Sequence, residues 1–233
     1  MHAVAQLLTR VLAGTALVAL VVVATPTRTT PAAADFTPIG AQAALAALRA
    51  STVEVFAFGC SLERDDGTAV AIGDGRLLTN AHVVAGSRLI DIAADDAATQ
   101  VAGEAFVATA GDVAVLGDSG NGRPGLALAT EDPAAGSTVR VGGFPAGGPG
   151  FTMVTMQVTD YVAGRGLGEP WPVMRLTESV RPGMSGGAVL DAAGRLAGIV
   201  FGNELPDGRA LAVPASQLRR LLVTNAFTPL VSC

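Results

Sequence analysis

A serine flanked by glycines and followed by an apolar run is the feature that most constrains this chain. Residues 181–191 read Arg-Pro-Gly-Met-Ser-Gly-Gly-Ala-Val-Leu-Asp, with Ser185 at the centre. Glycines let the backbone turn sharply, so the hydroxyl projects outward and nearby backbone N–H groups converge beside it. Such a turn is typical of a nucleophile next to a site that stabilises an oxyanion. The stretch therefore predicts a tight turn, a buried strand after it, and Ser185 as a candidate nucleophile.

A serine hydroxyl is a weak nucleophile, so this interpretation requires a histidine base and a carboxylate to orient it. The chain has two histidines, and His2 lies in the N-terminal segment, which leaves His82 in Thr-Asn-Ala-His-Val-Val. Asp112 follows in Gly-Asp-Val-Ala-Val-Leu, where it enters an apolar run. Taken singly, His82 is more often a structural histidine, Asp112 a turn residue and Ser185 part of a plain turn. The three motifs together, in this order, favour a Ser-His-Asp triad.

These three segments resemble the trypsin-like, or chymotrypsin-fold, serine proteases, and most of all the HtrA-like and MarP-type exported bacterial proteases. The resemblance runs from about Val53 to the C-terminus and includes no PDZ-sized segment. It implies that His82, Asp112 and Ser185 are catalytic. One departure is Met184, where relatives carry aspartate or asparagine. We expect packing of Met184 and the rigid φ of Pro182 to order the oxyanion loop, without an ion pair to a new N-terminus. The alternative is a loop that is collapsed at rest and is ordered when substrate binds.

The resemblance also implies roles for residues near the nucleophile. Gly183 and Ser185 would donate backbone N–H groups to the oxyanion. Ser179 would form the floor of the pocket for the side chain before the scissile bond, and a neutral floor favours apolar residues over Lys or Arg. The remaining expected substrate-binding residues are Val200, Phe201 and Gly202.

Composition and length suit an all-β fold. Hydrophobic residues make up 50% of the 233 residues but aromatic ones only 4%, so the core must use small, often β-branched side chains, which favour strands. We expect two six-stranded antiparallel β-barrels with a short helix at each end. From residue 35 onward the chain has 13 arginines, no lysine and 20 acidic residues. This balance argues against nucleic acid as a partner.

The expected boundaries follow from turn signals such as Asp-Asp-Gly and Gly-Asp-Gly. Residues 35–52 read as a linker and short helix, and residues 53–233 as the protease domain. Within it we expect the first barrel at about 53–120, the second at about 134–214 and a helix at about 215–223. Strands of the first barrel are expected at 53–58, 68–72, 76–79, 88–92, 100–109 and 113–116.

The first 34 residues read as an export signal: an arginine, a 14-residue apolar run, and an Ala-Ala-Ala sequence before Asp35. The alternative is an uncleaved membrane anchor over residues 7–24. Either interpretation puts the protease domain outside the cytoplasm. Two cysteines, Cys60 and Cys233, suit that compartment and suggest a disulfide, and the alternative is two free buried thiols.

The predicted function is therefore that of an exported serine endopeptidase acting on protein or peptide substrates, with no metal or cofactor. The alternative is a catalytically silent exported binding protein that keeps the fold, and Met184 is the sequence feature that favours it.

Overall fold

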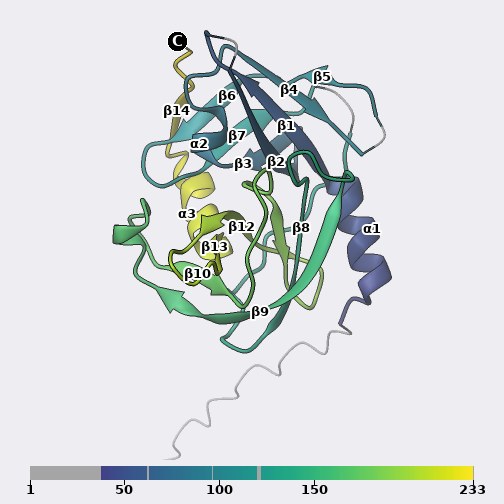
Figure 1. Ribbon diagram of the computed structural model, residues 1–233, viewed down its shortest axis with the longest axis vertical. Coiled ribbons are helices and arrows are strands. Elements are labelled where there is room, and N and C mark those ends of the chain that lie inside the picture. The colour runs from purple at the N-terminus through teal and green to yellow at the C-terminus, as the bar shows by residue number, and fades with distance from the viewer. Residues whose placement is uncertain (1–37, 62, 96, 120–121, 233) are drawn as a thin grey trace, which may run out of the picture. The chain divides into compact units, whose positions relative to one another are not determined.

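The computed structural model describes residues 38–61, 63–95, 97–119 and 122–232. It opens with helix α1 (Ala41–Ser51), continues into a curled antiparallel sheet, and then forms a closed antiparallel barrel (Figure 1). The fold class predicted from the sequence is confirmed: the protein is mostly β, with a short helix before the strands and another after the barrel.

Eight strands form the first sheet, in the spatial order β14-β6-β7-β3-β2-β1-β4-β5. The hairpin between β2 and β3 shows how sequence sets its register. Asp74 and Gly75 alone connect the paired residues Gly73 and Arg76, and both have positive φ, 52° and 65°. An Asp-Gly pair with two positive φ values makes the turn whose twist matches that of the flanking strands. The strands are β1 (Thr52–Phe58), β2 (Arg64–Gly73), β3 (Arg76–Thr79), β4 (Leu89–Ala93), β5 (Gln100–Val101), β6 (Ala105–Ala108), β7 (Ala114–Gly117) and β14 (Phe227–Pro229).

The strand count of this first sheet differs from the prediction of a six-stranded barrel. The expected strand at 100–109 is two strands, β5 and β6, because the chain changes partner at Gly103, whose N–H donates to Gly117 O at 2.8 Å. A Cβ on Gly103 would lie 3.1 Å from the Gly117 Cα, so the two backbones meet directly. The C-terminal strand β14 then pairs with β6 and brings the end of the chain to this sheet.

Six strands close into the second barrel, in the order β10-β13-β12-β11-β8-β9. Its interior is filled by small and branched side chains, as the composition predicted, together with Met156, Met174 and Met184. The strands are β8 (Thr138–Gly143), β9 (Thr152–Val162), β10 (Val173–Leu176), β11 (Ala188–Leu190), β12 (Leu196–Asn203) and β13 (Ala210–Pro214).

A shared apolar core joins the sheet, the barrel and both longer helices. Helix α1 contributes Ala44 and Leu48, and helix α3 (Ala215–Thr224) contributes Leu218 and Leu221, all at most 2% exposed. Helix α3 ends at Thr224 and is followed by Asn225, whose left-handed φ of 48° is a common way to stop a helix. This core fixes the sheet against the barrel, and the candidate site draws residues from both.

Three predictions concern residues that the structure does not describe. The export signal at residues 1–34, its alternative as an anchor over residues 7–24, and Cys233 all lie outside the described residues. Within the described ranges, no helix combines the length and hydropathy needed to cross a membrane.

Candidate active site

His82 projects from a single helical turn, α2 (Ala81–Val84), directly after strand β3. Val83 and Val84 anchor this turn in the core of the first sheet, at most 1% exposed. The His82 side chain points away from that core and is 49% exposed. The local pattern of histidine followed by two valines therefore produces an accessible imidazole on a rigid support.

Asp112 lies beside His82 and makes two hydrogen bonds to it. Asp112 Oδ2 lies 2.5 Å from His82 Nδ1, and Asp112 Oδ1 accepts the backbone N–H of His82 at 2.8 Å. An ionised carboxylate only accepts hydrogen bonds, so the imidazole proton is at Nδ1 and Nε2 has a free lone pair. This is the tautomer that a general base requires.

The environment of the pair adjusts the basicity of His82. The hydrogen bond to Asp112 raises the pKa of His82 above its ordinary value, and the charges of Asp112 and Asp65 act in the same direction. Partial burial of the ring opposes these effects. The net result is an imidazole that accepts a proton more readily than a free histidine does.

The two peptide groups that flank the Asp112 Cα are each bound by a further side chain. Asn80 Nδ2 donates to Asp112 O at 2.8 Å, and Asp112 N–H donates to Glu169 Oε1 at 2.6 Å. Asn80 precedes the helical turn of His82, whereas Glu169 lies in the second barrel, between β9 and β10. Neither contact was predicted from the sequence, because nothing in Gly-Leu-Gly-Glu-Pro-Trp distinguishes Glu169 from an exposed loop carboxylate.

The loop around Ser185 is bound to the first sheet through Thr68, a fully buried residue of β2. Thr68 N–H donates to Ser185 O at 2.7 Å, and Thr68 Oγ1 donates to Gly183 O at 2.9 Å. The same oxygen accepts the N–H of Phe144 at 2.9 Å. Thr68 O in turn accepts the hydroxyl of Thr79, three residues before His82. Thr68 thus links the serine loop to the chain that carries the histidine, a role that its sequence context did not reveal.

The glycines of the loop are required by close backbone contacts. Gly183 and Gly186 have φ values of 87° and 84°. A Cβ on Gly186 would collide with Thr68 O and Thr79 Oγ1, and one on Gly183 would lie 2.7 Å from Phe144 O. Met184 between them is 2% exposed and packs in the barrel core. The loop is therefore ordered by packing and by hydrogen bonds to its backbone, and Met184 has no charge with which to form an ion pair.

With this geometry established, residues 67–199 match the family model of the trypsin-like peptidase domain. The chain belongs to that family. It is 36% identical over 152 residues to the serine protease Rv3671c of Mycobacterium tuberculosis strain H37Rv, an alignment that covers 61% of this chain and 37% of that protein. The chain thus spans little more than a third of the length of the curated relatives it matches.

Solved structures agree with this assignment to the trypsin-like peptidases. The active form of the Rv3671c protease from M. tuberculosis superimposes with a TM-score of 0.71 at 28% identity, covering 84% of this chain and 91% of that one. The HtrA-type protease AlgW with a tripeptide gives a TM-score of 0.67 at 25% identity, covering 78% and 62%. The resemblance to HtrA-like and MarP-type proteases is thereby confirmed at the level of family and fold.

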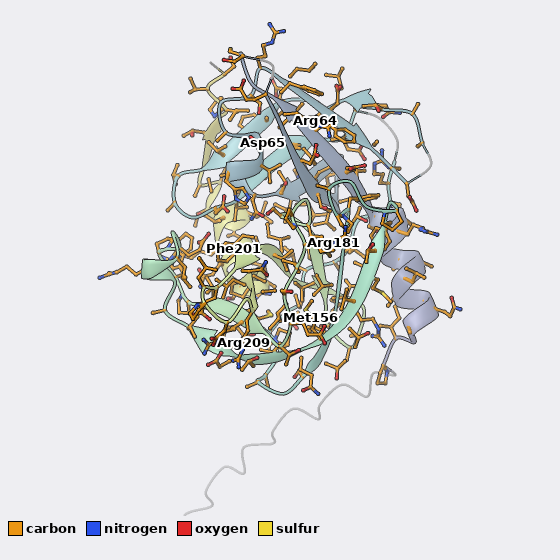
Figure 2. The ribbon with its side chains drawn as sticks, viewed as in Figure 1. Arg64, Asp65, Met156, Arg181, Phe201 and Arg209 are labelled. Atoms are coloured by element: carbon orange, nitrogen blue, oxygen red, sulfur yellow. The ribbon has the colours of Figure 1, made fainter. Side chains whose placement is uncertain are left out.

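The four predicted substrate-binding residues of this trypsin-like domain occupy different environments. Ser179 is exposed in the segment that leads to the serine loop, and Phe201 and Gly202 are partly buried. Val200 is fully buried, and its backbone accepts the Gly186 N–H and donates to Gly187 O. Figure 2 shows Phe201 in the part of the barrel that lies toward the first sheet in that view.

A β-bulge in β12 at Phe201 was not predicted. Val200 pairs with Ala212 and Gly202 with Leu211, so Phe201 is the extra residue. Bulges of this kind often re-aim a side chain next to a functional site. The end of β12 is bound to the segment that precedes the serine loop. Asn203 Oδ1 accepts the Val180 N–H at 2.9 Å, and Asn203 Nδ2 donates to Val180 O at 2.8 Å.

Within the described part of the chain, no group of three or more His, Cys, Asp or Glu side chains is placed to hold a metal ion. The predicted partner of Cys60, Cys233, lies outside the described residues.

Proposed function

We propose that this chain is an exported serine endopeptidase that hydrolyses peptide bonds through an acyl-enzyme. The observation that carries the proposal is the double hydrogen bond between Asp112 and His82, at 2.5 and 2.8 Å, in a member of the trypsin-like peptidase family. It fixes the ring and the tautomer, so Nε2 is available to take the proton of a serine hydroxyl.

In the proposed reaction, Ser185 Oγ attacks the carbonyl carbon of the substrate while its proton passes to His82 Nε2. The tetrahedral intermediate collapses, the C–N bond breaks, and His82 gives the proton to the leaving amine. A water molecule then loses a proton to His82 and attacks the ester. The carboxylic acid leaves, and the proton returns to Ser185. Asp112 orients the ring throughout and stabilises its charged form.

The proposed oxyanion site consists of the N–H groups of Gly183 and Ser185. Each belongs to a trans peptide whose carbonyl already has a partner: Pro182 O accepts the Ala146 N–H at 2.9 Å, and Met184 O accepts the Gly187 N–H at 2.8 Å. In a trans peptide the N–H points opposite to the C=O, so both donors face away from these contacts. No acceptor for either N–H occurs among the described residues. Each such donor contributes about 3 kcal/mol to transition-state stabilisation in measured cases.

The alternative of a silent binding protein rests on Met184 in the place of a polar residue. The burial of Met184 in the barrel core argues against this alternative, because it gives the side chain a packing role that orders the loop. The packing of Met184 therefore favours an active serine endopeptidase over a silent binding protein.

Protein or peptide chains are the proposed substrates, with cleavage after apolar residues of medium size. Support comes from the neutral Ser179 and from the bulge at Phe201 on the strand that would pair with substrate. Digestion of a peptide library should give cleavage after Leu, Val or Met. Dominant cleavage after Lys or Arg would contradict this assignment.

We further propose export by the segment 1–34 and a Cys60–Cys233 disulfide in the exported protein. Ser232 forms a β-bridge with Gly86, and Arg88 N–H donates to Phe58 O at 2.9 Å, so the C-terminus approaches the turn that carries Cys60. Peptide mapping without reductant should recover the two cysteines as one linked fragment. Recovery of both as alkylated thiols would exclude the bond, and sequencing of the mature N-terminus tests cleavage before Asp35.

Labelling with a fluorophosphonate tests the enzyme proposal, because only an activated serine reacts. The wild-type domain should take up the label on Ser185, whereas Ser185→Ala and His82→Ala should not. Ser137→Ala, a substitution of the same type remote in sequence, serves as the control and should label like the wild type. A folded wild-type protein that takes up no label would favour the silent alternative.

A further inference from the structure

Glu169 is a buried carboxylate with no part in the reaction described above. It is 2% exposed, although it lies in a short, turn-rich segment between β9 and β10. Gly164 O accepts the N–H of both Leu167 and Glu169, at 2.7 and 3.0 Å, and so closes the segment into a tight loop. A Cβ on Gly164 would lie 2.6 Å from the Glu169 Cβ, so only glycine fits where the two ends of the loop meet. Glu169 is thus directed inward by the backbone around it.

Both carboxylate oxygens of Glu169 lie against the segment of Asp112. Oε1 accepts the Asp112 N–H at 2.6 Å. Oε2 lies over Gly111, where a Cβ would be only 2.8 Å away, and Gly111 has a φ of 81°. Burial raises the pKa of Glu169, and the charge of Asp112 adds to this effect, while the hydrogen bond from the Asp112 N–H opposes it. A carboxylate in this position is costly to bury, and the bond to Asp112 offsets part of that cost.

The segment that carries Asp112 has few other constraints. It lies between β6 and β7 and is irregular at residues 109–113. Its neighbours are fixed by Ala108 N–H donating to Val113 O and by Thr109 N–H donating to Ala226 O, at 2.8 and 2.9 Å. The peptide groups of Asp112 itself depend on side chains: Asn80 on the carbonyl and Glu169 on the N–H. Loss of either bond would free the peptide group on that side of the Asp112 Cα, and we expect the direction of the carboxylate toward His82 to change with it.

Glu169 is itself supported from the C-terminal helix. Trp171 packs against the shared core, two residues after Glu169, and the Arg220 guanidinium of α3 lies 5.7 Å from the centre of its ring. The Trp171 ring also limits space at Gly111, where a Cβ would be 3.0 Å from Cζ3. The loop of Glu169 is therefore anchored on both sides of the carboxylate.

We propose that Glu169 is a positioning residue that connects the second barrel to the aspartate of the proposed triad. Through its bond to the Asp112 N–H, it sets the direction in which the Asp112 carboxylate meets His82. The inference rests on the proposed function, and it gives the β9–β10 loop a role in the reaction through its hydrogen bond to Asp112.

Three substitutions separate positioning from mere stability. Glu169→Gln keeps an acceptor oxygen at the same reach, Glu169→Met keeps the length without the acceptor, and Glu169→Asp keeps the charge but withdraws it by one methylene. Glu131→Met, at an exposed glutamate in the segment that precedes β8, is the control for the loss of charge. The readouts are kcat and KM on a peptide substrate, and the far-downfield proton resonance of the His82 Nδ1–H bonded to Asp112.

Glu169→Met should lower kcat by about 10- to 100-fold with KM nearly unchanged, because a misplacement of about 1 Å in a catalytic group has this effect. It should also shift or broaden the downfield resonance. Glu169→Gln should stay within about 3-fold of the wild type and keep the resonance, since the acceptor is retained. Glu131→Met should change neither kcat nor the downfield resonance.

Wild-type kcat and an unmoved resonance in Glu169→Met would overturn the proposal, as would equal losses in the Gln and Met variants. If the Met variant does not fold, Glu169→Asp decides: a fall in kcat with a shifted resonance supports positioning, and wild-type values refute it. If the wild-type protein shows neither hydrolysis nor labelling, the proposed function fails. The resonance of the His82–Asp112 bond then still tests Glu169 on its own.

Discussion

The two halves of the candidate site are built in different ways. The His82–Asp112 pair depends on side-chain hydrogen bonds, from Asn80 and Glu169 as well as between the two residues. The Ser185 loop depends on backbone hydrogen bonds and on glycines that no other residue can replace. The only side-chain hydroxyl that binds the loop directly is Thr68, among the described residues.

Because the two halves are held by different kinds of contact, they should tolerate different substitutions. Backbone contacts around Ser185 survive most side-chain substitutions but fail when a glycine gains a Cβ, because there is no space and φ is positive. Contacts around Asp112 can be altered one hydrogen bond at a time, with graded effects on the reaction. We expect large, all-or-none effects in the serine loop and smaller ones around the pair.

The largest effect should come from Gly186→Ala. Its new Cβ would collide with Thr68 O and Thr79 Oγ1, at a φ of 84°. We expect a loss of about 3 kcal/mol or more in the free energy of unfolding, together with loss of activity. Gly166→Ala is the matched control, since a Cβ there meets nothing within 4 Å. Denaturant unfolding of both variants measures the difference. Similar stabilities would mean that the serine loop is less constrained than its contacts indicate.

An intermediate effect is expected for Thr68→Val, which replaces a hydroxyl by a methyl group of similar size. It removes the donor to Gly183 O and leaves the Phe144 N–H without its acceptor in a buried site. Such a loss costs about 1–3 kcal/mol of stability. It should also lower kcat, because the Gly183 carbonyl would no longer be fixed. Thr155→Val, on an exposed part of β9, should be nearly neutral in unfolding and kinetic assays. A neutral Thr68→Val would show that the loop does not depend on this hydroxyl.

These contacts also explain how much of the protein was predictable. The motif around Ser185 was visible because backbone geometry forces glycine at fixed spacings, and the Asp74-Gly75 hairpin was visible for the same reason. His82 and Asp112 were predicted from the motifs around them, Thr-Asn-Ala-His-Val-Val and Gly-Asp-Val-Ala-Val-Leu. Thr68 and Glu169 did not, because a buried hydrogen bond between residues far apart in sequence requires only a common polar side chain.

The fold shows the same limit. The β-branched composition and the turn signals predicted the strands and the small-residue core, but not the number of strands in the first sheet. The division of residues 100–109 depends on Gly103 meeting Gly117, and β14 depends on where the end of the chain lies against β6. Both are tertiary contacts that leave no local signal.

The smallest effect tests the His82–Asp112 pair through pH. The pKa of His82 is raised, chiefly by its hydrogen bond to Asp112, and His82 must be neutral to act as base. As pH falls, kcat/KM should therefore decline through that raised pKa, above the ordinary histidine value of about 6.5. Asp65→Asn removes one charge that raises this pKa, so the decline should move to lower pH, while Asp207→Asn, at an exposed site, should leave it in place. A profile that is flat through this range in the wild type would exclude His82 as the base.

The central claim is that Ser185 forms an acyl-enzyme. His82 activates the serine, and Asp112 orients His82. Rapid mixing of the protein with an activated ester measures this directly, because acylation precedes deacylation. The account predicts an initial burst of about one equivalent of leaving group per protein molecule, absent in Ser185→Ala and in His82→Ala. The acyl group should then be found on the peptide that contains Ser185. Hydrolysis without a burst in the wild type, or a burst that persists in Ser185→Ala, would contradict the account.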